Sequence, residues 1–280
     1  MSFNISVIGL GLMGRTIARG LMRAGYRVRG WNRSALSRDL IGDIPLCRDL
    51  HNAADADICL LMLADSNAVD AVIAELEPHL APGKLVLDMG SSDPIRSEQH
   101  AQRLAAKGIG WVDAPVSGGP EGAANGTLTI MVGAREKDFA RAKPILVKLG
   151  STVARVGDPG AGHKMKVINQ LIVGITIEAV AEALTLAERI GIDPRLVQEV
   201  LKGGFADSKI LQIHGSRMIA RTYTPGAKVS TQLKDLRMAK ALADASGAHL
   251  PHLEKTLEIY ARLVAEGAGD LDHSAPHKLL

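Results

Sequence analysis

The segment NISVIGLGLMG at residues 4–14 constrains the fold more than any other, because an apolar run leads directly into closely spaced glycines. Gly9, Gly11 and Gly14 form a G-x-G-x-x-G turn between a predicted strand and a predicted helix. In such a turn the first glycine permits the tight bend, the second lets a pyrophosphate approach the backbone, and the third lets helix and strand pack closely. The helix N-terminus then offers N–H groups and a positive dipole end to phosphates. The segment therefore predicts dinucleotide binding, and the alternative is a structural glycine turn without a ligand.

The end of the second predicted strand indicates which dinucleotide is bound. A unit of this kind usually places an Asp or Glu about 20 residues beyond the turn, where it holds the ribose hydroxyls. Residues 31–34 instead read WNRS, without a carboxylate. Asn32 removes the charge that would repel a 2′-phosphate, Arg33 supplies a planar donor fork, and Ser34 adds a hydroxyl. We expect NADP(H) to be preferred over NAD(H), unless Arg33 is merely a solvated surface arginine.

The first half of the chain alternates short apolar runs with amphipathic segments. This alternation predicts an N-terminal Rossmann-type, doubly wound α/β domain, with a mostly parallel sheet covered by helices on both faces. The predicted strands are residues 5–10, 27–31, 56–63, 84–90 and 109–116, and the predicted helices are residues 13–25, 66–80 and 94–108.

The pattern changes after about residue 160. Residues 164–190 predict a helix of about 40 Å that is too apolar to lie on a surface, so we expect it to be buried between domains or subunits. Further helices follow at residues 194–204, 230–247 and 251–267, without convincing strands. We therefore expect an NADP-binding domain at residues 1–160 and an all-α substrate and dimerisation domain at residues 161–280. The long interdomain helix also predicts a homodimer or homotetramer, because a monomer would expose much of it.

Composition excludes several classes of function. The chain of 280 residues has 46% hydrophobic residues, 22% charged residues and a net charge of +3, without basic runs interleaved with aromatics, so no nucleic acid is expected as a partner. Cys47 and Cys59 show no metal-ligand spacing, and neither a metal nor a disulfide framework is expected. No stretch approaches the roughly 20 apolar residues of a membrane span, and no signal peptide is evident. These features predict a soluble cytoplasmic protein without a membrane partner.

Two separated motifs carry candidate chemistry. In DAPVSGGPEGAANGTLTIMVGA, Ser117, Gly118 and Gly119 offer a hydroxyl and backbone N–H groups to a carboxylate, and the alternative is a mobile glycine-rich loop. In GAGHKMKVINQ, the side chains of Lys166, Asn169 and Gln170 share one helical face. A cation and two amides on an apolar helix are costly unless they are used.

Two further residues of these segments are weaker candidates. Lys234, in KDLRMA, either pairs with Asp235 or adds positive charge over a substrate anion, and the two interpretations are nearly equal. His163 precedes Lys166 by three residues, and we interpret it as a loop residue rather than as a second acid.

With these motifs the sequence resembles the β-hydroxyacid dehydrogenase family over nearly the whole chain. The resemblance rests on GLGLMG, the Ser117 motif, GAGHKMKVINQ, KDLRMA and GDLDHSA, in matching order and separation. LKGGFADSKIL and TYTPGAKVSTQLKDL place the chain nearest the tartronate semialdehyde reductase branch. The resemblance departs at three places: Asn-Arg-Ser replaces Asn-Arg-Thr or an acidic signature, Gln170 replaces a second Asn, and Gly90 replaces a serine.

The resemblance implies roles for individual residues. Lys166 would be the catalytic lysine, and Ser117, Gly118 and Gly119 would bind the substrate carboxylate. Substrate contacts would also come from Asn169, Gln170, Ser91 and Lys234. Cofactor contacts are assigned to Gly9, Leu10, Gly11, Met13, Gly14, Asn32, Arg33, Ser34, Met62, Leu63, Ser91 and Lys234.

These assignments predict an NADPH-dependent reductase of small aldehyde acids such as tartronate semialdehyde, glyoxylate or succinic semialdehyde, with Lys166 as general acid. A lysine that is protonated near neutral pH and an NADPH preference both favour reduction. The alternatives are an oxidative 3-hydroxyisobutyrate-type dehydrogenase, an imine reductase, a 6-phosphogluconate-type dehydrogenase and a non-catalytic NADP-binding protein. Lys166 disfavours the imine reductase, the short helical half disfavours the 6-phosphogluconate type, and Lys166 with Ser117 disfavours the non-catalytic protein.

Overall fold

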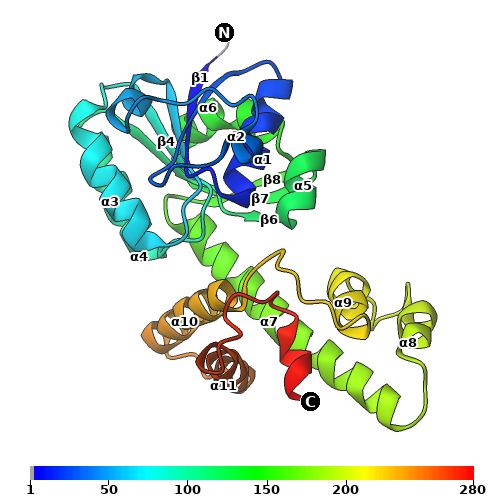
Figure 1. The fold of residues 1–280 in the computed structure, drawn as a ribbon. Helices are drawn as coiled ribbons and strands as arrows, with labels where there is room; N and C mark the ends of the chain where they lie inside the picture. The colour runs from blue at the N-terminus through cyan, green and yellow to red at the C-terminus, as the bar shows by residue number, and fades with distance from the viewer. Residues whose placement is uncertain (1–2) are drawn as a thin grey trace. The chain divides into compact units, whose positions relative to one another are not determined.

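The computed structural model describes residues 3–280 and divides the chain into two compact units (Figure 1). The first unit comprises Met1–Lys166 and the second Val167–Leu280. Cys47 and Cys59 are both buried and unpaired in the first unit.

The first unit contains one eight-stranded sheet in the order β2-β1-β3-β4-β5-β7-β6, with β8 also paired to β7. The first five strands run parallel, as expected, whereas β7 runs antiparallel to β5 and β6 and parallel to β8. The strands are β1 (Asn4–Ile8), β2 (Arg27–Trp31), β3 (Ile58–Leu61), β4 (Leu85–Asp88), β5 (Gly110–Asp113), β6 (Val116–Ser117), β7 (Leu128–Ala134) and β8 (Gly150–Gly157).

Helices cover both faces of this sheet (Figure 1). Strand side chains alternate between the two faces, so Leu60 and Leu87 join one buried core whereas Leu61 and Val86 join the other. The first core includes residues of α1 (Leu12–Arg23), α5 (Gly119–Asn125) and α6 (Glu136–Leu146), and the second includes residues of η1 (His51–Asp55), α3 (Ser66–Leu76) and α4 (Pro94–Ala105). The unit also contains α2 (Arg38–Ile41) and η2 (Glu77–His79). The predicted doubly wound fold is therefore confirmed.

The sequence-based prediction omitted the last part of this sheet. β7, β8, α5 and α6 were not anticipated, although Leu128–Ala134 is buried at six of its seven positions. Their topology breaks the regular βα alternation, because β7 returns antiparallel to β5. Pro144 lies inside α6 and weakens the helical signal there.

Within residues 167–280, all of which the structure describes, the second unit is helical, and its β pairing is limited to an isolated bridge between Lys228 and Asp272. One core cluster joins α10 (Val229–Ser246), α11 (Pro251–Ala265) and η4 (Ala275–Leu279) to the start of this unit at Val167. A smaller cluster joins Ile177, Ala181 and Leu184 to η3 (Ile210–His214) and α9 (Gly215–Ile219). The remaining helix is α8 (Pro194–Leu201), which Asp193 caps by accepting a hydrogen bond from the Arg195 amide.

Helix α7 (Ala161–Arg189) is the predicted long helix, and it corrects two expectations. It begins at Ala161 rather than at residue 164, so His163 is a helical residue and not a loop residue. Its most apolar window has a mean hydropathy of 1.6, and the helix is therefore long and apolar enough to cross a membrane by length and composition. The expectation that no segment approaches a membrane span is wrong on that criterion. The criterion is weak, because core helices of soluble proteins also meet it.

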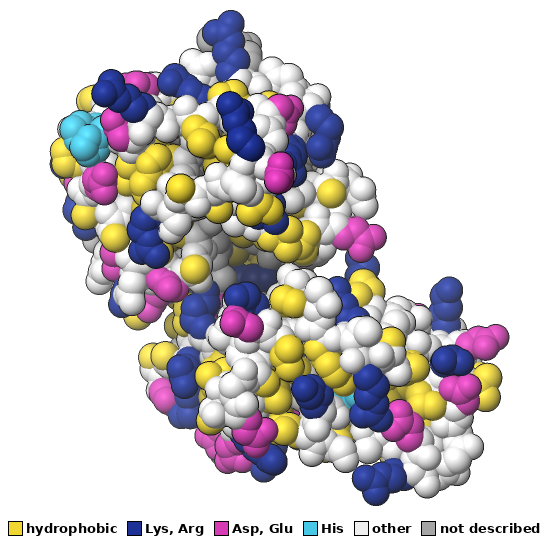
Figure 2. Space-filling view, viewed as in Figure 1, with side chains coloured by type: hydrophobic (Ala, Val, Ile, Leu, Met, Phe, Trp, Pro, Cys, Tyr) yellow, Lys and Arg dark blue, Asp and Glu magenta, His cyan; other side chains and the backbone are white. Residues whose placement is uncertain are grey.

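On the face shown in Figure 2, basic and acidic side chains are interspersed and hydrophobic side chains lie between them.

Candidate active site

The glycine turn joins β1 to α1, and each glycine has a different reason to lack a side chain. A Cβ at Gly9, whose φ is +95°, would lie 2.3 Å from the Met62 carbonyl oxygen. A Cβ at Gly14 would lie 1.8 Å from the Gly9 carbonyl oxygen, so helix and turn pack in direct contact. A Cβ at Gly11, the N-cap of α1, would meet nothing within 4 Å. Gly9 and Gly14 therefore serve packing, and Gly11 leaves open space beside the helix N-terminus.

The loop after β2 is held to this turn by Asn32. Its Oδ1 accepts a hydrogen bond from the Leu10 amide at 3.0 Å, and its Nδ2 donates to the Ser34 carbonyl at 2.8 Å. Arg33 and Ser34 are exposed at the end of β2. Asn32 thus shapes the loop, and the side chains available to a phosphate there are those of Arg33 and Ser34.

The other residues predicted to contact the cofactor lie in the first turn of α1 and just after strands β1, β3 and β4. Leu10 is completely buried in the sheet core, so only its backbone borders the turn. Met13 and Met62 are partly buried against the same core, and Leu63 packs against the other core. A Cβ at Gly90 would lie 3.1 Å from the Leu63 carbonyl oxygen, which places the loop containing Ser91 beside the loop after β3.

The structure brings Lys166 to the glycine-rich segment after β5. Its Nζ donates a hydrogen bond to the Val116 carbonyl oxygen at 2.8 Å. Val116 and Ser117 form β6, and Gly118 and Gly119 follow with φ values of +125° and +63°. Two successive positive φ values are accessible to glycine and rare for other residues, which explains this pair. The lysine thus lies beside the segment expected to bind a carboxylate, although fifty residues separate Lys166 from Val116.

Three buried polar residues near Lys166 were not predicted as site residues. Asp88 and Asp113 end β4 and β5, pair in register and have no exposed surface. His163 is also completely buried, and its Nε2 lies 3.7 Å from Asp88 Oδ2. Burial raises the pKa of Asp113, although His163 and the hydrogen bonds it accepts oppose this. The signal that was missed is a carboxylate at the end of two adjacent parallel strands, where ligand sites of such sheets gather.

The remaining predicted residues lie in the helical unit. Asn169 donates from Nδ2 to Gln170 Oε1 at 2.8 Å. The Gln170 amide nitrogen donates to Gln232 Oε1 and Asp235 Oδ2, each at 2.9 Å, which joins α7 to α10. Gln170 therefore fixes one helix against another, and Gln232 and Asp235 are partners that the sequence did not reveal. Lys234 Nζ lies 3.3 Å from Asp235 Oδ1, as one of its two interpretations expected.

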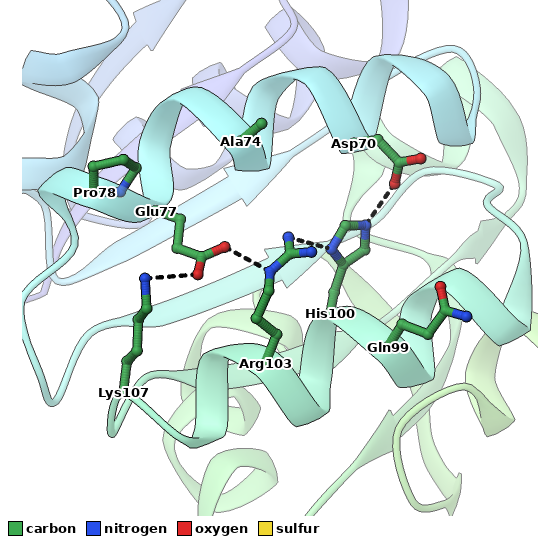
Figure 3. A pocket seen from close by; sticks show the side chains of 8 residues that line it. All are labelled: Asp70, Ala74, Glu77, Pro78, Gln99, His100, Arg103 and Lys107. Atoms are coloured by element: carbon green, nitrogen blue, oxygen red, sulfur yellow. Dashed lines mark hydrogen bonds and ion pairs between the residues drawn. The ribbon is translucent and has the colours of Figure 1, made fainter.

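A pocket of about 570 Å³ lies elsewhere on the first unit, between α3, η2 and α4 (Figure 3). Arg103 and Lys107 both donate to Glu77, and His100 bonds Arg103 through Nδ1 and Asp70 through Nε2. Burial raises the pKa of Glu77, but the hydrogen bonds from the two cations outweigh it and lower the pKa. The lining also includes Ala74, Pro78 and Gln99. No predicted site residue lines this pocket, and its charges pair with one another across the helices.

One cluster among residues 3–280 has metal-ligand chemistry, namely His214, Asp272 and His273 in the helical unit. Asp272 already accepts hydrogen bonds from Arg217, Gly226 and Ser274. Burial raises the pKa of Asp272, but hydrogen bonds from His214 and Ser274 lower it well below its usual range. A carboxylate that is saturated by protein donors and paired with an arginine is a structural ion pair rather than a cation ligand.

Comparison with known proteins identifies the family of the chain. The family model for the NAD binding domain of 6-phosphogluconate dehydrogenase matches residues 4–157. The model for the NAD-binding of NADP-dependent 3-hydroxyisobutyrate dehydrogenase matches residues 160–280.

Individual relatives match over nearly their whole length. The 2-hydroxy-3-oxopropionate reductase of Escherichia coli is 39% identical, over 97% of this chain and 94% of the relative. The L-threonate dehydrogenase of Cupriavidus necator is 33% identical, over 100% and 96%. The crystal structure of a 3-hydroxyisobutyrate dehydrogenase from Salmonella typhimurium is 30% identical, covers 100% of both chains and has a TM-score of 0.90. The chain belongs to the β-hydroxyacid dehydrogenase family and is an oxidoreductase of hydroxy acids with a dinucleotide-binding domain.

Proposed function

We propose that this protein is an NADPH-dependent reductase of small aldehyde acids, with tartronate semialdehyde, glyoxylate and succinic semialdehyde as the candidate class. The observation that carries the proposal is the hydrogen bond from Lys166 Nζ to the Val116 carbonyl. This contact next to Ser117, Gly118 and Gly119 supports a role for Lys166 as acid and for the glycine-rich segment in binding a carboxylate. The 39% identity to the E. coli 2-hydroxy-3-oxopropionate reductase supports an aldehyde acid over a simple alcohol.

The chemistry needs three contributions. The hydride accepted by the aldehyde carbon would come from bound NADPH. Lys166 hydrogen-bonds the carbonyl oxygen and transfers a proton to it as negative charge develops, a contribution typically of about 10²–10⁴-fold. The segment at Ser117 holds the carboxylate and so fixes the aldehyde in one orientation. Ser91 lies in the neighbouring loop, next to Ser92, whose hydroxyl is bonded to Asp88.

The preference for NADPH rests on the end of β2. No carboxylate follows Trp31 there, and the exposed Arg33 and Ser34 supply a cation and a hydroxyl for a 2′-phosphate. The cofactor would be held by the Gly11 opening at the N-terminus of α1, with Met62 and Leu63 bordering the turn. Asn169 and Lys234 are proposed as further ligand contacts from the helical unit.

An oxidative 3-hydroxyisobutyrate-type dehydrogenase is the second candidate, favoured by the 30% identical Salmonella enzyme of that name. Both reactions use the same lysine, as acid in reduction and as base in oxidation. A charged lysine is a poor base, so the two candidates differ in the direction that is faster near neutral pH.

The decisive experiment follows NADPH and NADH oxidation with tartronate semialdehyde, glyoxylate and succinic semialdehyde. We expect faster turnover with NADPH, a loss of about 10²–10⁴-fold in kcat for Lys166→Ala, and retained activity for Lys164→Ala. Lys164 is the matched control, since it lies on the same helix and pairs with Glu98 at 2.7 Å. Arg33→Ala should weaken NADPH binding and leave NADH binding unchanged. Equal activity in Lys166→Ala, or a preference for NADH, would contradict the corresponding part of the proposal.

We also propose that the chain forms a homodimer or homotetramer through its helical unit. Ile172, Leu186 and Ile190 on and just after α7 are each at least 61% exposed, and Val200 on α8 is 75% exposed. Several exposed apolar side chains on the helices of one unit favour a protein–protein contact. Sedimentation at micromolar concentration tests this, and a monomer would contradict it.

A further inference from the structure

Asp88, Asp113 and His163 form a cluster that the proposed reaction does not use directly. All three side chains are essentially inaccessible to solvent. Asp88 and Asp113 are register partners on β4 and β5, and His163 lies in the first turn of α7. Buried carboxylates are costly unless they are paired and hydrogen-bonded, so a cluster of this kind has a structural or functional reason.

Each carboxylate anchors a different segment. Asp88 Oδ1 accepts a hydrogen bond from the Gly90 amide, and its Oδ2 accepts one from the Ser92 hydroxyl, both at 2.9 Å. Asp88 therefore fixes the loop on either side of Ser91. Asp113 Oδ1 accepts from the Gly160 amide at 2.7 Å and its Oδ2 from the His163 amide at 3.0 Å. Asp113 therefore fixes the start of α7, one helical turn before Lys166.

His163 is the residue that touches both carboxylates. Its backbone amide bonds Asp113, and its ring nitrogen Nε2 lies 3.7 Å from Asp88 Oδ2. Neither ring nitrogen has a hydrogen-bond partner among residues 3–280. Buried polar atoms almost always have a hydrogen-bond partner, so this exception needs a reason. The carboxylate of Asp88, 3.7 Å from Nε2, is a group that can explain it.

The backbone around the cluster is built to admit this close approach. A Cβ at Gly133 would lie 2.5 Å from Asp113 Oδ2, and a Cβ at Gly162 would lie 2.6 Å from the Asp113 carbonyl oxygen. A Cβ at Gly90 would lie 3.1 Å from Asp88 Oδ1. Gly133 of β7 and Gly90 of the loop after β4 thus leave the space that the carboxylates fill, and Gly162 lets α7 approach the backbone of β5.

We propose that His163 is a positioning residue whose Nε2 carries a proton directed at Asp88, and which thereby holds the Ser91 loop and Lys166 at a fixed separation. The inference rests on the proposed function of Lys166 only for its kinetic consequence. The chain of contacts runs from the loop at Ser91 through Asp88 and His163 to Asp113 and the first turn of α7. A displaced lysine would still be chemically competent but would meet the carbonyl oxygen in the wrong geometry.

The kinetic test compares His163→Leu with His163→Gln. Leucine fills the space without an N–H, whereas the Gln amide can present an N–H near the position of Nε2. We expect His163→Leu to lower kcat by about 10- to 100-fold, as small misplacements of a reacting group do, with little change in NADPH affinity. His163→Gln should recover most of the lost kcat. Equal losses in the two variants, at matched folded fractions, would overturn the positioning role.

A matched control uses another buried histidine of the same unit. His100 bonds Asp70 at 2.7 Å and Arg103 at 3.1 Å, and it stacks on Trp111. His100→Leu therefore removes a buried imidazole without touching either carboxylate anchor. We expect it to change stability and leave kcat unchanged. A fall in kcat equal to that of His163→Leu would show that loss of any buried histidine has this effect, and would overturn the inference.

A second readout is independent of turnover. In protein labelled with ¹⁵N-histidine, the His163 shifts should show Nε2 protonated at pH 7. A ring protonated only on Nδ1 would direct a lone pair at Asp88 and overturn the inference. If the wild-type protein reduces no aldehyde acid, the proposed function fails while this measurement still decides the arrangement of His163. If Lys166→Ala is inactive and His163→Leu is fully active, the function stands and the inference fails.

Discussion

The start and the middle of helix α7 differ in how the carboxyl groups at each place are hydrogen-bonded. At its start, Asp113 accepts two backbone hydrogen bonds, from Gly160 and His163. Further along, Glu178 belongs to the helix itself, and its Oε1 is buried without a hydrogen-bond partner among residues 3–280. Burial, together with the smaller effect of the neighbouring Glu182, raises the pKa of Glu178 to about 8.

This difference indicates that the first turn of α7 is held in a fixed geometry, whereas the turns around Glu178 only need to fill a core. The first turn of α7 is held by directional hydrogen bonds to the sheet, and glycines allow it to approach the backbone closely. The turns from Ile177 to Leu184, beyond the hydrogen bonds of Gln170, are held by apolar contacts such as those of Ile177 and Leu184 with Leu211 and Met218. Directional contacts are found where a proposed catalytic lysine follows, and non-directional contacts where the helix only supports a core.

The largest expected difference in the free energy of unfolding is between two alanine substitutions in α7, Gly162→Ala and Gly174→Ala. A Cβ at Gly162 would lie within 2.7 Å of three backbone atoms, in Asp113, Met131 and Gly133. A Cβ at Gly174 would meet side-chain atoms instead, with Gln232 Nε2 the nearest at 2.9 Å. We expect Gly162→Ala to lower the free energy of unfolding by about 3 kcal/mol or more, since backbone cannot yield as side chains do. Gly174→Ala should stay within about 1 kcal/mol of wild type, because alanine also favours helix.

Urea denaturation of both variants measures the difference in the free energy of unfolding. Turnover at a matched folded fraction is a second measurement. Gly162→Ala should also lose activity, because the displaced first turn carries Lys166. Similar stabilities for the two variants would mean that the start of α7 is no more constrained than its middle. That result would contradict the proposed difference between the two parts of the helix.

Much of this fold was predictable because its strands and helices are strongly periodic. The runs ending at Leu61 and Asp88 are buried at every position, and the amphipathic α1 and α4 carry clear helical faces. The last strands were not predictable, because nothing local in residues 128–157 states that β7 turns antiparallel to β5. Pairing direction depends on the path of the connection between two strands, here through β6 and α5, and not on the residues of the strand itself.

The candidate site divides in the same way. Lys166 and Ser117 could be identified because their motifs combine residue types that are costly without a use. Asp88 and Asp113 were missed because a single carboxylate at a strand end has no local pattern, and only the sheet register brings the two together. His163 was misplaced because Gly160 and Gly162 suggest a loop, whereas Gly162 lies inside the helix. Gln232 and Asp235 became visible only as partners of Gln170.

Isosteric substitutions of the two carboxyl groups should have smaller effects, and they should change the free energy of unfolding in opposite directions. Asp113→Asn leaves one acceptor oxygen for two backbone N–H groups and sets an amide N–H against the other. We expect a loss of about 1–3 kcal/mol in the free energy of unfolding. Glu178→Gln removes the charge of a carboxylate whose Oε1 has no hydrogen-bond partner among residues 3–280. We expect it to stabilise the protein by about 1–3 kcal/mol at pH 9.

The pH dependence distinguishes this mechanism from a change in packing. The pKa of Glu178 is raised in the folded state, from 4.5 to about 8, so the folded protein binds the extra proton between these values. Its contribution to stability is therefore complete below pH 4.5 and is lost as the pH rises through 8. The gain in Glu178→Gln should vanish at pH 4.5 and grow toward pH 9, as urea denaturation at the two pH values would show. A gain that is independent of pH would mean that packing, not the unpaired charge, distinguishes Glu178 from Asp113.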